Sequence, residues 1–274
     1  MDRSLRLWVN PFSVMAALYV SAGLFFAILK GLEVLPGMVA PSNLNWLRVH
    51  LITIGTITQI IFAALPAILS RRLSIPDRPV GEGWIQWALL NAGFVLAVIG
   101  LVGIEPWTAS IGATLVFVAV YRLLVSIVQS WRAGGRPWRE SFRFYGTAPL
   151  YLLTGIIMAV SLLFNWWAPG GRIGVLEAHV HANVWGFLAL IVAGMLFDLF
   201  PAVAGGPMAR PKWIGATYHL LNVGAIGLVV GPWINVHEVT VGGLLIYFVG
   251  TALLLANLVL TLLQHKKPTP AALH

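Results

Sequence analysis

Two histidines separated by one residue, His179 and His181, open a long apolar stretch, "EAHVHANVWGFLALIVAGMLFDLFP" (177–201). An imidazole in hydrocarbon is costly, so such a residue usually has a specific task. On an α-helix, residues two apart point about 200° away from each other, whereas two residues that share one ion are separated by three or four positions. We therefore expect His179 and His181 to serve two different neighbours.

A third histidine, His50, opens another apolar stretch, and His237 lies at the start of a further one. At 1.5 Å per residue, His50, His179 and His181 are expected in or near the first helical turn, roughly 3–8 Å below the outer membrane boundary. Imidazoles on facing helices are a common means of holding haem iron from both axial positions. The alternative is that these histidines cap helices or lie at the lipid interface.

The helices that position these histidines follow from the composition. Hydrophobic residues make up 59% of the chain and charged residues 9%, with a mean hydropathy of +0.87, whereas soluble domains are about a quarter charged. We expect an all-α integral membrane protein, an eight-transmembrane-helix bundle that forms one domain over residues 1–274 without a convincing internal repeat. The predicted spans are 11–31, 47–69, 84–103, 107–130, 146–166, 178–202, 213–232 and 240–264.

Basic residues gather on one side of the predicted spans. The outer loops hold only Lys30, Arg48 and Arg172 if the N-terminus is cytoplasmic. The positive-inside rule therefore places the N- and C-termini in the cytoplasm and the chain in the inner membrane as a multi-pass protein. The net charge of +8 has the same origin, so we expect lipid headgroups and not nucleic acid as partners. The inner basic residues are Arg3, Arg6, those of "RRLSIPDR" and "WRAGGRPWRESFR", Arg210, Lys212, Lys266 and Lys267.

The two histidine segments together resemble the catalytic subunit of haem–copper oxidases and nitric oxide reductases. In that superfamily one helix carries His-x-His before a Gly-rich apolar run that ends in Phe-Pro, as "AHVHANVWGF…GMLFDLFPAVAG" does here. The other marker is a histidine that opens the second helix and leads to Pro-Ala, as in "VHLITIGTITQIIFAALPAIL". The resemblance implies that His50 and His181 are axial ligands of a low-spin haem. It also implies that His179 is the proximal ligand of a second, high-spin haem.

The chain departs from that superfamily in the region that would bind copper. Superfamily members have more spans and take copper ligands from histidines on middle helices, whereas this chain has no histidine between Gly55 and Glu177. It also has no cysteine, which excludes thiolate-held clusters and haem attached through a Cys-x-x-Cys-His motif. We therefore expect haem b, one or two per chain, held by side-chain ligation and packing, and no copper centre of the usual kind.

Other residues are candidates for contact with the haem. Haem propionates need cations or hydrogen-bond donors near the membrane surface, and Arg48 and Arg172 are suitably placed cations. His237 is a candidate for binding a propionate or for ligation at a second site. Gly186 lacks a side chain and is expected to let a flat macrocycle approach its helix.

Three functions are compatible with these features. The first is a membrane haem protein that transfers electrons or binds a diatomic gas, NO or O2. The second is a small nitric oxide or oxygen reductase with a non-standard metal site, and the third is a transporter or structural membrane protein without haem. The sequence favours the first, because the second lacks the usual metal ligands and transporters tend to have broken helices with midplane polar sites. An unknown electron donor and a homo-oligomer are compatible with it.

Overall fold

The computed structural model describes residues 10–31, 41–77, 79–135 and 140–265. It is 89% helical, and no strand occurs among the described residues. Eight helices in this part of the chain are long and apolar enough to cross a membrane. The predicted all-α, multi-pass membrane fold is therefore confirmed. The terminal basic residues Arg3, Arg6, Lys266 and Lys267, which contributed to the predicted topology, lie outside the described residues.

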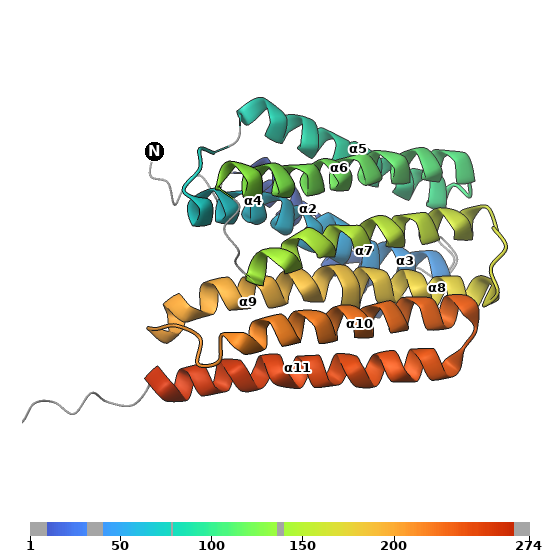
Figure 1. The fold of residues 1–274 in the computed structure, drawn as a ribbon. Helices are drawn as coiled ribbons and strands as arrows, with labels where there is room; N and C mark the ends of the chain where they lie inside the picture. Colours follow the sequence, from blue (N-terminus) through green and yellow to red (C-terminus); the bar gives the residue numbers. More distant parts are fainter. Residues whose placement is uncertain (1–9, 32–40, 78, 136–139, 266–274) are drawn as a thin grey trace, which may run out of the picture. The chain divides into compact units, whose positions relative to one another are not determined.

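The chain divides into two compact units, which we call unit 1 (Met1–Pro137) and unit 2 (Trp138–His274). Each unit contains four spans, and the second span of each includes a π-helical segment. Figure 1 shows the helices of both units by label and by colour along the chain. Unit 1 contains α2 (Pro11–Gly31), the continuous span α3 (Pro41–Ile52), η1 (Thr53–Thr58) and α4 (Gln59–Leu73), then α5 (Val80–Val102) and α6 (Pro106–Ala133). Unit 2 contains α7 (Glu140–Leu163), the span α8 (Gly171–His181), η2 (Ala182–Leu188) and α9 (Ala189–Ala204), then α10 (Lys212–Ile234) and α11 (His237–His265).

All eight predicted spans correspond to these helices, but the second, fifth and sixth begin six or seven residues earlier than expected. Helix α8 starts at Gly171, which has a φ of +60°, a left-handed conformation that glycine adopts without strain. His50, His179 and His181 consequently lie eight to ten residues after the first residue of their helices, about 12–15 Å along the axis. The expectation that they lie in the first turn is wrong.

Close backbone contact at glycine holds the α5–α6 hairpin of unit 1 together. A Cβ atom at Gly93 would lie 2.8 Å from the Gly112 carbonyl oxygen and from the Val116 nitrogen. A Cβ atom at Gly100 would lie 2.2 Å from the Ala109 nitrogen. No larger residue fits at these positions unless a helix moves. The close approach maximises van der Waals contact, the main source of helix association in lipid.

The α10–α11 hairpin of unit 2 repeats these contacts. A Cβ atom at Gly224 would lie 2.8 Å from the Gly243 carbonyl oxygen and 2.7 Å from the Tyr247 nitrogen. A Cβ atom at Gly231 would lie 2.6 Å from the Thr240 nitrogen. Each of these residues lies 131 positions after its counterpart in unit 1, and the sequence "LLNAG" at 89–93 becomes "LLNVG" at 220–224.

A tyrosine on the first span of each unit is bonded to an asparagine on the third span. The Tyr19 hydroxyl donates to Asn91 Oδ1 at 3.1 Å, and the Tyr151 hydroxyl donates to the Asn222 carbonyl at 3.0 Å. Both asparagine Nδ2 groups also donate to the carbonyl four residues earlier, at 2.8 Å. The four-span arrangement therefore occurs twice, which corrects the expectation that the chain lacks an internal repeat.

The glycine contacts predict that two neighbouring substitutions on α11 differ in their effect on stability. Gly243→Ala is expected to destabilise the protein by about 1–3 kcal/mol, because its Cβ atom would lie 2.8 Å from the Gly227 backbone. Gly242→Ala is the control, because a Cβ atom there meets nothing within 4 Å. Thermal unfolding of the purified variants in detergent measures the difference. Equal melting temperatures for the two variants would contradict the proposed packing.

Candidate functional site

The second span of each unit changes from α-helix to π-helix just after a histidine. His50 lies three residues before Thr53, the first residue of η1, and His181 directly precedes η2. A side chain satisfies part of the altered backbone in η1, where the Thr58 hydroxyl donates to the Thr53 carbonyl at 3.0 Å. Single π turns within α-helices are rare and occur frequently at functional sites.

The imidazole of His50 is held by its own helix. Its Nδ1 donates to the Trp46 carbonyl oxygen at 2.9 Å. The ring also stacks on the indole of Trp46, with centroids 4.3 Å apart and 23° between the planes. Because a carbonyl oxygen only accepts hydrogen bonds, Nδ1 carries the proton and the lone pair of the neutral ring is on Nε2.

His179 and His181 contact different helices. The Nδ1 of His181 donates to the Leu228 carbonyl on α10 at 2.7 Å, whereas the Nδ1 of His179 donates to the Gly155 carbonyl on α7 at 2.8 Å. This confirms the expectation that the two imidazoles serve different neighbours. As at His50, this bond leaves the lone pair of the neutral form on Nε2, and at His179 the Asn183 Nδ2 lies 3.4 Å from that nitrogen. A backbone carbonyl on Nδ1 is a common second contact of a histidine that ligates a metal through Nε2.

Asn183 packs against His179 one helical turn further along. Its Nδ2 donates to the His179 carbonyl at 2.8 Å and lies 3.2 Å from His179 Nδ1. Its Oδ1 is buried and has no hydrogen-bond partner within the described chain. Gly155 makes room for this amide, since a Cβ atom there would lie 2.3 Å from Asn183 Oδ1. Gly155, His179 and Asn183 thus form one tightly packed group.

The internal repeat relates the histidines of the two units. The segment "VHLITIG" at 49–55 matches "VHANVWG" at 180–186, again with a separation of 131 residues. His50 and His181 therefore occupy equivalent positions, and so do Gly55 and Gly186. The residue equivalent to His179 in unit 1 is Arg48. His179 is thus specific to unit 2, whereas His50 and His181 are a matched pair.

The glycine of each matched segment accommodates a tyrosine. A Cβ atom at Gly186 would lie 2.3 Å from the ring of Tyr151, and one at Gly55 would lie 2.8 Å from the ring of Tyr19. The tyrosine ring fills the space beside the helix in both units. The expectation that Gly186 admits a flat macrocycle is therefore wrong.

The residues predicted to bind propionates lie in three places. Arg172 closes the turn between α7 and α8, where its Nη1 donates to the Leu162 carbonyl at 2.7 Å and to Asn165 Oδ1 at 3.0 Å. Arg48 lies on α3 of unit 1, two residues before the candidate ligand of that unit. His237 is the exposed first residue of α11 in unit 2. A propionate contact by any of the three stays a prediction.

Sequence reasoning missed the residues that orient the histidines. Backbone carbonyls such as those of Gly155 and Leu228 leave no mark in a sequence, because every residue has one. Tyr151 did leave a signal, since "YVSAG" at 19–23 and "YLLTG" at 151–155 share the spacing of tyrosine and glycine. A comparison of the two halves of the chain would have found it.

Comparison of the chain with protein-family models and with curated proteins finds no match. Its function is therefore inferred from its own residues. Three imidazoles with Nδ1 bonded to a backbone carbonyl present Nε2 as the nitrogen suited to metal ligation, and haem iron accepts such ligands in a chain without thiols.

The packed group around His179 predicts that alanine is more destabilising at Gly155 than at Gly23, the equivalent glycine of unit 1. Gly155→Ala is expected to cost about 1–3 kcal/mol, because its Cβ atom would displace the buried Asn183 amide and with it His179. Gly23→Ala is the matched control, since its Cβ atom would lie 3.1 Å from the flexible end of the Ile52 side chain. Thermal unfolding in detergent tests both variants. A Gly155→Ala protein as stable as Gly23→Ala would show that the amide is not confined.

Proposed function

We propose that this chain is a membrane-embedded haem b protein that transfers electrons or binds a diatomic gas such as NO or O2. His50 and His181 are the axial ligands of a low-spin haem, and His179 ligates a second haem. The protein lies in the inner membrane with both termini in the cytoplasm. The asymmetric distribution of basic residues in the sequence supports this topology.

The matched positions of His50 and His181 carry the proposal. Both follow a valine and precede a glycine by five residues, and each lies on the second span of its unit beside a π-helical segment. A six-coordinate haem needs two axial ligands, and two imidazoles in the same sequence context are suited to supply them. His179, whose counterpart is Arg48, does not belong to this pair.

The donor chemistry of the histidines fits haem iron. The Nδ1 protons are engaged by carbonyl oxygens at 2.7–2.9 Å, which orients each ring. The chain's own contribution is therefore to hold the ligand nitrogens in place. When bound, the haem supplies one-electron chemistry and, at a five-coordinate iron, a site for a diatomic gas. Arg48, Arg172 and His237 are the proposed partners of the propionates.

Replacing either matched histidine tests the low-spin haem. We expect His50→Ala and His181→Ala each to abolish the sharp reduced-minus-oxidised bands of a six-coordinate haem, and added imidazole to restore them by filling the vacated ligand position. The measurement is absorption spectroscopy of the purified, monodisperse variants.

His219→Ala is the control for these two variants, because His219 is an exposed residue of α10. Its spectrum should equal that of the unaltered protein. A six-coordinate spectrum that survives in both the His50 and the His181 variants would refute the ligand assignment.

His179→Ala tests the second haem. We expect pigment analysis to give two haems per chain in the unaltered protein and one in the variant, with loss of the fraction that binds carbon monoxide, because a haem without a sixth ligand is open to gas. A ratio of one haem per chain in both proteins would instead make His179 a structural residue that bonds Gly155 and packs on Asn183.

A further inference from the structure

The loop between α9 and α10 is fastened to the end of α11. The Arg210 nitrogen donates to Asn257 Oδ1 and the Asn257 Nδ2 donates back to the Arg210 carbonyl, both at 3.0 Å. The Ala209 nitrogen donates to the Thr261 hydroxyl at 3.0 Å. Asn257 and Thr261 are fully buried. Two buried polar side chains are therefore committed to holding this loop in one position.

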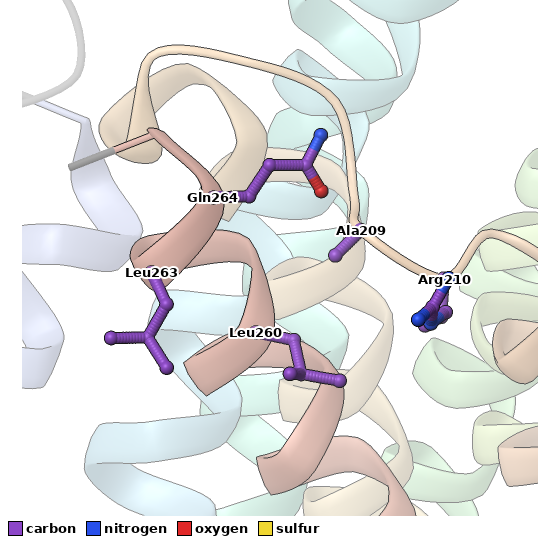
Figure 2. A pocket seen from close by; sticks show the side chains of 5 residues that line it. All are labelled: Ala209, Arg210, Leu260, Leu263 and Gln264. Carbon is purple, nitrogen blue, oxygen red and sulfur yellow. The ribbon is translucent and has the colours of Figure 1, made fainter. Parts of the chain in front are cut away.

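This attachment forms the wall of a shallow pocket of about 280 Å³. Figure 2 shows Ala209 and Arg210 on the loop and Leu260, Leu263 and Gln264 on α11 around it. Arg210 is exposed, and its guanidinium makes no ion pair within the described residues. The pocket thus combines a positive group and an amide with two leucine side chains.

The local charge at this end of unit 2 is positive. Lys212 follows Arg210 by two residues and opens α10. Asp198 on α9 is buried, and its two oxygens accept bonds from the hydroxyls of Ser141 at 2.7 Å and Tyr145 at 2.9 Å. An anion entering the pocket therefore meets Arg210, with Lys212 two residues further along the chain, and no exposed carboxylate of α9 or the loop.

An apolar row leads along α11 into the same pocket. Leu255, Val259 and Leu263 are spaced four residues apart and are 53–58% exposed. Residues four apart lie on one face of a helix, so these side chains form a continuous strip that ends beside Gln264. A ligand with an anionic head and a long apolar chain matches a strip that ends in a positive pocket.

We propose that this pocket binds one anionic phospholipid, with its phosphate on Arg210 and Gln264 and an acyl chain along Leu255, Val259 and Leu263. The planar guanidinium of arginine can donate two parallel hydrogen bonds to the oxygens of one phosphate. The amide of Gln264 supplies a further donor. The buried bonds of Asn257 and Thr261 hold the loop so that Arg210 stays at the mouth of the pocket. This site is separate from the proposed haem ligands.

Native mass spectrometry of the purified full chain with added phosphatidylglycerol or phosphatidylcholine tests the site. We expect preferential retention of one phosphatidylglycerol, and an affinity about fivefold lower in Arg210→Gln, the effect of one basic residue near an anionic headgroup. Arg132→Gln is the matched control, since it removes the same charge from the end of α6 in unit 1. The haem spectrum is recorded for each protein and should be the same in all three.

Three results would overturn the site. If the Arg210 and Arg132 variants lose phosphatidylglycerol to the same extent, lipid retention depends on the net charge of the protein and not on this pocket. Equal retention of phosphatidylcholine and phosphatidylglycerol by the unaltered protein would exclude recognition of the anionic head. Displacement of the lipid by an equal concentration of inorganic phosphate would identify a soluble-anion site. Because haem content is measured separately, none of these results depends on the proposed haem ligation.

Discussion

A backbone carbonyl oxygen holds each of the three candidate ligand histidines, and the rest of the site depends on that hydrogen bond. Within a bilayer no water is available to an unpaired imidazole N–H, so the acceptor must come from the protein. A helical carbonyl has a second lone pair and accepts such a bond in addition to its bond within the helix. The carbonyls of Trp46, Gly155 and Leu228 fill this role and so determine the tautomer of every ring.

Glycine brings two of these carbonyls, those of Leu228 and Gly155, within reach of their histidines. A Cβ atom at Gly174 would lie 2.2 Å from the Pro232 carbonyl, so α8 lies directly against α10. His181, two turns further along α8, then reaches the Leu228 carbonyl one turn earlier on α10. On the other side of α8, Gly155 admits the Asn183 amide beside His179. Larger side chains at these glycines would hold the helices apart and leave the imidazoles without acceptors.

Hydropathy was sufficient to predict the helical class and all eight spans, because crossing a bilayer demands long apolar segments. The periodicity of the helix was sufficient to predict that His179 and His181 serve different helices. The starts of α3, α7 and α8 were missed, because polar residues in the first turns lower the local hydropathy to that of a loop. The π segments were missed too, since they arise from packing and from side-chain bonds such as that of Thr58.

The internal repeat was not predicted from the sequence, for a different reason. Most lipid-facing positions accept any apolar residue, so similarity between the units is confined to positions where helices touch and to one histidine. The separation also changes, from 132 residues between Tyr19 and Tyr151 to 131 residues between Asn91 and Asn222. Such sparse matches become visible when the two halves are compared directly, and the contacts then show why those positions are constrained.

The equivalence of Arg48 and His179 has an evolutionary consequence. A segment with four spans, an even number, begins and ends on the same side of a membrane, so a tandem duplication of its gene preserves the topology of both copies. Mutation then acts on each copy independently. Such a duplication would account for the helix-contact glycines and the histidine that both halves share, and for the position two residues earlier, which is arginine in one half and histidine in the other.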